Sequence, residues 1–161
     1  MTIDIRMLGR VDYATTVQAM QDYTTARSAG TPDVLWMCEH APLYTQGLAG
    51  KSDHVLNPGN IPVVATNRGG QVTFHGPGQL VGYPILDLDE HFTDIHRYLR
   101  TLEEVIIATL ADYGLSGDRS PGETGVWLDV GTPFARKICA MGVRASRWVT
   151  RLCSASCSSM R

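Results

Sequence analysis

No stretch of this sequence is apolar for long enough to cross a lipid bilayer. The longest apolar run, VIIATLA at 105–111, falls far short of the roughly 20 residues that a membrane-spanning helix needs. The N-terminal sequence MTIDIRMLGRVDY carries charges but no apolar run behind them, and a signal peptide requires such a run. We therefore expect a cytoplasmic protein without a membrane segment.

The spacing of the few cysteines excludes two common structural devices. The sequence lacks the spacing of a secreted disulfide framework, and it contains no CxxC or CxxH pattern of a metal site. We therefore expect reduced thiols, no metal centre and no cofactor. The four cysteines are Cys38, Cys139, Cys153 and Cys157.

The sequence has no excess of positive charge. Its 14 basic and 16 acidic residues give a net charge of −2, which excludes a nucleic-acid-binding protein that relies on bulk positive charge. Acidic residues are nevertheless absent from Val130 to the C-terminus, where six basic residues occur. Such a run is most often a solvated surface; the alternative is a docking surface for an acidic partner. The six are Arg136, Lys137, Arg144, Arg147, Arg151 and Arg161.

The length and the apolar pattern predict one α/β (α+β) domain, with a mixed sheet flanked by helices, over residues 1–150. Helices are expected at 12–29 and 94–113, the second with an i, i+3, i+4, i+7 apolar stripe and with Thr93 as its N-cap. The remaining segment, RLCSASCSSMR at 151–161, matches no period and predicts a disordered tail. Strands are expected at 3–8, 34–38, 43–46, 62–66, 71–75, 80–88, 125–129 and 137–143.

A glycine-rich stretch, RGGQVTFHGPGQLVGYP at 68–84, surrounds one of these strands. Glycine lets the backbone approach a ligand closely, so the strand and its turns are able to hold a bound group. The alternative is a pair of ordinary hairpin turns. The stretch is neither a Walker loop nor a GxGxxG dinucleotide loop.

Lys137 opens the apolar run Ile138–Met141. A lysine in this position is usually a surface charge with a buried stem. Alternatively, its ammonium points into a pocket and lowers the pKa of a nearby thiol. His40 and His75 are likewise more often structural than catalytic.

Four segments together resemble one family, the lipoyl(octanoyl) transferases. They are the glycine-rich stretch, EHAPLYTQG at 39–47, GVW at 125–127 and RKICAMGVR at 136–144. The resemblance covers roughly residues 3–150. It implies a fold similar to the catalytic domain of the lipoate and biotin protein ligases, a mixed sheet flanked by helices.

The resemblance also implies an activity, the transfer of an octanoyl group through a cysteine thioester. The donor is octanoyl-acyl carrier protein. The acceptors are lysines on lipoyl domains, those of the E2 subunits of 2-oxoacid dehydrogenases and the H protein of glycine cleavage. It implies no nucleic-acid partner and no membrane.

Carried over residue by residue, the resemblance implies a set of site residues. Lys137 matches the catalytic lysine that lowers the pKa of the nucleophilic cysteine. Ala140, Met141 and Gly142 match one segment that lines the acyl substrate. The other lining segment is Arg68, Gly69, Gly70, Gln71, Val72, Thr73, Phe74 and His75.

The sequence departs from the family after Thr150. Family members continue there with an HGxALN segment and then a PCG segment that holds the nucleophilic cysteine, and neither is present here. We therefore expect a C-terminal truncation or a frameshift near codon 150, and little or no activity of this chain. Two alternatives stay open, an ATP-dependent lipoate or biotin ligase and a non-catalytic remnant that binds an acyl chain or its carrier.

Overall fold

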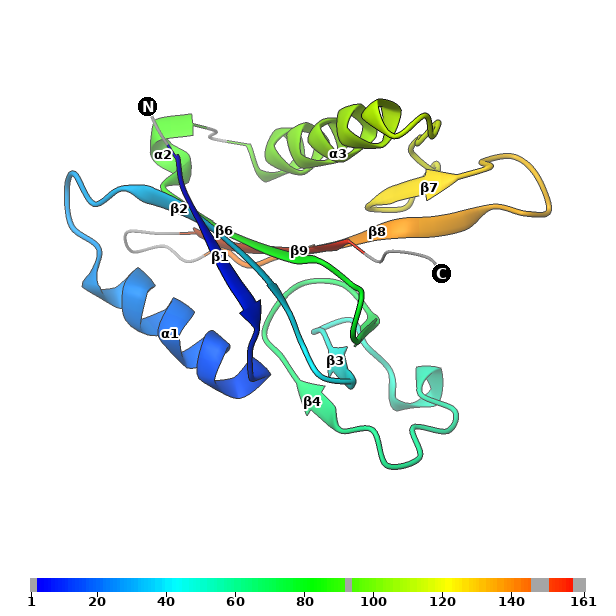
Figure 1. Cartoon of the computed structure of the whole chain (residues 1–161), viewed down its shortest axis with the longest axis horizontal. Coiled ribbons are helices and arrows are strands. Elements are labelled where there is room, and N and C mark those ends of the chain that lie inside the picture. The colour runs from blue at the N-terminus through cyan, green and yellow to red at the C-terminus, as the bar shows by residue number, and fades with distance from the viewer. Residues whose placement is uncertain (1–2, 92–93, 146–150, 158–161) are drawn as a thin grey trace.

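The structure, a computed structural model, describes residues 3–91, 94–145 and 151–157. Its main sheet has six strands in the order β1-β2-β6-β9-β8-β7 (Figure 1). β1 and β2 are parallel and the other neighbours antiparallel, so the sheet is mixed, as expected. The strands are β1 (Ile3–Arg10), β2 (Asp33–Glu39), β6 (Val81–Leu86), β7 (Val126–Leu128), β8 (Arg136–Val143) and β9 (Arg151–Cys157).

A second sheet of three strands, in the order β4-β3-β5, lies beside the first. It consists of β3 (Leu43–Gln46), β4 (Val63–Ala65) and β5 (Val72–His75). The strand prediction for 71–75 is confirmed, but the strand joins this small sheet rather than the main one. It does so because β5 pairs antiparallel with β3, and the chain leaves the main sheet between the end of β2 and the start of β3.

The two predicted long helices are present, on opposite sides of the main sheet (Figure 1). They are α1 (Tyr13–Ala26) and α3 (Ile95–Asp112); a short helix α2 (Leu88–His91) precedes α3, and a 3-10 turn spans Ser52–His54. Asp12 caps α1 by accepting a hydrogen bond of 2.9 Å from the Thr15 amide. α3 is capped by Asp94, whose carboxylate accepts from the His96 amide, and not by the predicted Thr93, which lies outside the described residues.

Each long helix packs on its own apolar cluster. On the α1 side, Met20 packs with buried residues of β2 and β6, among them Trp36 and Ile85. On the α3 side, Leu110 packs with Val126 of β7 and Cys139 of β8. The main sheet is therefore covered by a helix on each face.

Residues 151–157, expected from the sequence to be a disordered tail, form a strand in the structure. This segment forms β9, which pairs antiparallel with β6 on one side and with β8 on the other. The physical reason is that β6 and β8 each present a row of amides and carbonyls that needs a partner. Backbone pairing satisfies these groups whatever the apolar content of the added strand. Residues 158–161 lie outside the described part of the chain.

Candidate functional site

Two segments far apart in the sequence meet at the junction of the two sheets. The turn Arg68–Gly70 lies against β8, where the Gly69 amide donates a hydrogen bond of 3.0 Å to the Val143 carbonyl. A Cβ on Gly142 would lie 2.7 Å from the Gly69 oxygen and 3.0 Å from Cδ of Arg68. Gly70 has a φ of +87°, a conformation that favours glycine. Glycine at these positions therefore allows the two backbones to touch.

Arg68 holds the turn to the second sheet. Its Nη2 donates to the Thr45 carbonyl at 2.9 Å and to the Thr45 hydroxyl at 2.8 Å. The same hydroxyl lies 3.0 Å from Nε2 of His75. Burial lowers the pKa of the guanidinium, but an arginine remains charged at any physiological pH. The site therefore contains one fixed positive charge with oriented hydrogen-bonding partners.

A small cavity of about 20 Å³ lies where these groups converge. Its lining includes six of the residues expected from the resemblance, Arg68, Thr73, His75, Ala140, Met141 and Gly142. Sequence reasoning missed the other four, Tyr13, Thr45, Val81 and Tyr83. Three of these four carried a signal, because Thr45 stands in EHAPLYTQG, and Val81 and Tyr83 stand in the glycine-rich stretch.

The remaining expected residues lie elsewhere around the turn and β5. Gly69 and Gly70 shape the turn from outside the cavity lining. Phe74 is 38% exposed and its ring lies 5.2 Å from that of Tyr44. Gln71 and Val72 do not line the cavity either. Along β5, only alternate residues therefore face the cavity, as the two-residue period of a strand requires.

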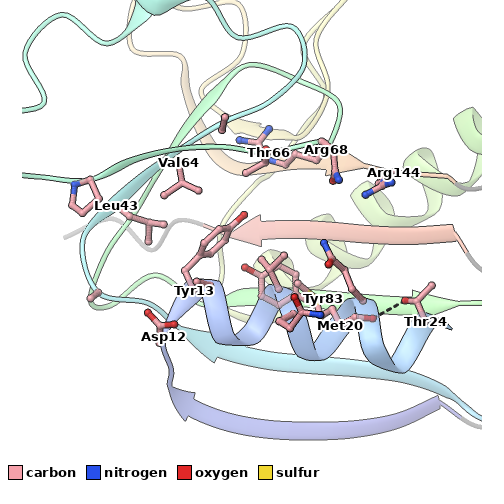
Figure 2. Close-up of a pocket in the computed structure, with 18 of the residues that line it drawn as sticks. Asp12, Tyr13, Met20, Thr24, Leu43, Val64, Thr66, Arg68, Tyr83 and Arg144 are labelled. Atoms are coloured by element: carbon pink, nitrogen blue, oxygen red, sulfur yellow. Dashed lines mark hydrogen bonds between the residues drawn. The ribbon is translucent and has the colours of Figure 1, made fainter. Parts of the chain in front are cut away.

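A larger cavity of about 1090 Å³ opens beside the small one, between α1 and the β3–β4 region (Figure 2). Tyr13, Arg68 and Tyr83 line both cavities. Arg68 and Arg144 lie on one side of the larger cavity, across from Met20 and Thr24 of α1 (Figure 2). Small-molecule sites in general have volumes of about 300–1,000 Å³, so the volume of this cavity is comparable.

A buried cluster of aromatic and imidazole rings forms the floor of the site. The Tyr13 ring lies 5.3 Å from the His40 ring and 6.2 Å from the His75 ring. His40 places Nδ1 2.9 Å from the Val11 carbonyl and Nε2 2.8 Å from the Tyr83 hydroxyl. Because a carbonyl only accepts, Nδ1 carries the proton and Nε2 accepts from the tyrosine. His40 is therefore a neutral, fixed structural group here, as the sequence favoured.

The electrostatics of this cluster favour neutral side chains. Burial, together with smaller contributions from the nearby His40 and Arg68, lowers the pKa of His75 to about 4. Burial also lowers the pKa of His40 and raises the pKa of the Tyr83 hydroxyl. Nδ1 of the buried His75 has no hydrogen-bond partner among the described residues. Arg68 is thus the fixed charge among neutral groups.

Lys137 lies apart from this cluster. Its Nζ is 3.2 Å from a carboxylate oxygen of Glu123 and 4.8 Å from the centre of the Trp127 ring. Lys137 lines neither of the two cavities described above. The structure therefore brings the two expected acyl-lining segments together but does not bring Lys137 to them.

The two cysteines whose side chains the structure describes are buried. Burial raises the pKa of the Cys38 thiol to about 11, and its sulfur lies 3.6 Å from Nε2 of His40. Cys139 packs in the α3 cluster. A nucleophilic cysteine needs a lowered pKa and access to its substrate, so neither thiol has the required environment. Within the described residues no group of side chains could hold a metal ion, and no helix is long and apolar enough to span a membrane.

Comparison with known proteins identifies the family. The model of the lipoyl protein ligase A/B catalytic domain matches residues 12–157. The chain belongs to this family. The match extends to residue 157, the end of β9.

Relatives of this chain carry the name octanoyltransferase. One from Polaromonas naphthalenivorans is 52% identical over 93% of this chain and 75% of its own length. One from Flavobacterium psychrophilum is 50% identical over 92% of this chain and 72% of its own length. One from Christiangramia forsetii is 64% identical over 70% of this chain and 50% of its own length. The chain is therefore an acyltransferase-family member that spans between half and three quarters of these relatives.

Solved structures confirm the expected fold. A bipartite lipoate protein ligase from Thermoplasma acidophilum aligns with a TM-score of 0.71 at 20% identity, over 99% of this chain and 63% of the other. A lipoate-protein ligase A bound with ATP aligns with a TM-score of 0.71 at 19% identity, over 100% of this chain and 68% of the other. At such identities the likeness concerns the fold alone.

Proposed function

We propose that this protein serves the transfer of an octanoyl group from octanoyl-acyl carrier protein to a lysine of a lipoyl domain, through a cysteine thioester. The relatives named octanoyltransferase support the octanoyl group. The single observation that carries the proposal is the meeting of the Arg68–His75 and Ala140–Gly142 segments around one cavity. Because the proposed donor is an acyl carrier protein, we expect the reaction to take place in the cytoplasm.

The lining of the cavity suits an acyl thioester. Val81 and Met141 offer apolar surface for a hydrocarbon chain, and the guanidinium of Arg68 offers N–H groups for a carbonyl oxygen. A cavity of about 20 Å³ has room for little more than one water molecule. The octanoyl chain therefore extends into the larger cavity along their shared wall of Tyr13, Arg68 and Tyr83.

Arg144 gives the larger cavity a second positive charge. Acyl carrier proteins are acidic, and Arg144 in the wall of the larger cavity has the opposite charge. We assign the carrier to the side of the chain on which this cavity opens. Raised salt weakens such an approach because it screens exposed charges over about 8–10 Å.

Within the proposed mechanism, Lys137 stabilises the thiolate of the nucleophile. A nearby ammonium favours the charged form of a thiol and so increases its attack on the thioester carbonyl. Because Cys38 and Cys139 are buried, neither supplies this thiol. We expect this 161-residue chain to bind the octanoyl group and to show little or no turnover on its own.

Binding and turnover are measured separately to test the proposal. Calorimetry with a soluble octanoyl thioester is expected to show saturable binding that Arg68→Ala weakens at least tenfold. Incubation with octanoyl-acyl carrier protein and a lipoyl domain is expected to give little octanoylated product by mass spectrometry. A melting temperature raised by ATP with lipoate, and not by the octanoyl thioester, would instead identify an ATP-dependent ligase.

A further inference from the structure

β1 forms an open edge of the main sheet. It pairs with β2 on one side, and no strand of the described residues pairs with its other side (Figure 1). All eight of its residues, Ile3–Arg10, are exposed. An open edge presents unpaired amides and carbonyls that another strand is able to bind.

The residues of this edge give only part of the usual protection against pairing, since β1 has charges and a bulge but no proline. Edge strands commonly carry proline or charges that repel a second strand. β1 contains no proline, and its apolar residues Ile3, Ile5 and Met7 share one face, with exposed fractions of 46%, 62% and 73%. The opposite face carries Asp4 and Arg6, which have opposite signs and lie 2.8 Å apart.

A bulge limits the part of β1 that is regular. The register with β2 shifts between Met7 and Gly9, so the regular strand runs from Ile3 to Met7. Ile5 is the centre of this segment. The sequence around Ile5 is symmetric in character, with one charged residue and then one apolar residue on either side.

We propose that β1 binds β1 of a second copy of this chain, antiparallel, about a two-fold axis at Ile5. In this register Ile5 lies opposite the second copy's Ile5, and Ile3 lies opposite the second copy's Met7. Asp4 lies opposite the second copy's Arg6, so two ion pairs flank the axis. The interface is self-complementary, as a two-fold dimer requires.

The charges select this register among the alternatives. A shift by two residues in one direction places Asp4 opposite Asp4, and the same shift in the other direction places Arg6 opposite Arg6, which is unfavourable. A shift by one residue places charged side chains opposite apolar ones on the wrong face. Parallel pairing in register again places like charges together. In the proposed register, each pair of opposed residues is either both odd-numbered or both even-numbered. The outward-pointing amides and carbonyls of one strand therefore face those of the other, whichever set of alternate residues points outward.

The dimer is expected to be weak. A ladder of five residues buries less than the roughly 1,200 Å² of a stable interface. Association should therefore depend on protein concentration. The pairing also extends the six-stranded sheet of one copy into that of the other.

Charge-swap variants test the pairing by sedimentation velocity over a hundredfold range of concentration. The unmodified chain is expected to shift from monomer toward dimer. Asp4→Arg alone, or Arg6→Asp alone, places like charges opposite each other and is expected to raise the dissociation constant at least tenfold. The double variant D4R/R6D restores opposite charges and is expected to restore the dimer.

A control and three contrary results complete the design. Val105→Lys on α3, 56% exposed, adds a charge to a similar apolar surface position and should leave association unchanged. Circular dichroism spectra identify any variant that fails to fold, and Ile5→Lys then replaces it as a second disruption of the axis. The proposal is wrong if the chain is monomeric at every concentration, if the single variants associate normally, or if the double variant stays dissociated.

Discussion

The Gly69 amide donates a hydrogen bond of 3.0 Å to the Val143 carbonyl, and this bond joins the second sheet to β8 of the main sheet. The two expected acyl-lining segments meet at this contact. Its formation depends on the missing side chain of Gly142, because a Cβ there would press on Gly69 and Arg68. The geometry of the site therefore depends on this contact between the two backbones.

Gly142→Val should separate the two segments. Overpacking a close contact costs about 1–3 kcal/mol of unfolding free energy, and the displaced turn should weaken octanoyl-thioester binding. Urea unfolding and calorimetry measure the two effects. Ala145→Val, at an exposed position just beyond β8, is the control and should change neither. Unchanged stability and binding in Gly142→Val would show that the contact does not shape the site.

Stability should fall as the pH falls from 6.5 toward 4, because His75 is buried in its neutral form. Its folded pKa is about 4 and its unfolded pKa about 6.5, so between these values the unfolded chain binds more protons. The contribution of His75 to the free energy of unfolding is fully present above pH 6.5. About 2 kcal/mol of it is lost at pH 5. His40 has a pKa shifted in the same direction and adds to the slope.

Urea unfolding at pH 7 and pH 5 measures this loss. His75→Gln should reduce the difference in unfolding free energy between the two pH values and leave the part due to His40. His96→Gln, at an exposed position on α3, should leave the difference as it is. An equal pH dependence in all three proteins would contradict the buried neutral state of His75.

Glu103 should be a major source of stability on the α3 side. Its fully buried carboxylate accepts from Arg100 at 2.7 Å, from Arg119 at 3.0 Å and from the Gly125 amide at 2.9 Å. Glu103→Ala leaves these donors without their acceptor and should cost about 3 kcal/mol. Glu104→Ala removes an exposed carboxylate 2.7 Å from the same Arg119 and should cost less than about 1 kcal/mol. Equal losses by thermal unfolding would contradict this account.

Lys137→Ala should leave the fold nearly unchanged, because it removes a partly exposed ion pair and a contact with Trp127. In protein that turns over octanoyl thioester, it should lower kcat strongly and shift the rate profile to higher pH. Glu123→Gln breaks the same ion pair but keeps the ammonium, so it should retain most of the rate. A full rate for Lys137→Ala between pH 6 and 9 would remove Lys137 from the mechanism.

The elements of the fold could be predicted wherever a local pattern defines them. Both long helices follow from their apolar periods, although α3 is capped by Asp94 and not by the predicted Thr93. The strands follow from short apolar runs bounded by turns. β9 could not be predicted, because its pairing is determined by the needs of β6 and β8 and not by its own residues. The division into two sheets is likewise a matter of long-range pairing.

The site was predictable in part, and through resemblance more than through pattern. Arg68, His75 and Met141 do line one cavity. Tyr13 could not be identified, because the first turn of a helix carries no sign of which distant strand it faces. The position of Lys137 beside Glu123 also depends on a long-range contact, which spacing in the sequence does not reveal.

Photolabelling tests the central claim most directly. An octanoyl thioester with a diazirine close to its carbonyl is irradiated with the folded chain, and the modified residues are identified by mass spectrometry. The account predicts adducts within Arg68–His75 and Ala140–Gly142 that an excess of unlabelled octanoyl thioester suppresses. Adducts confined to other segments, such as α3, or adducts that resist competition, would contradict it.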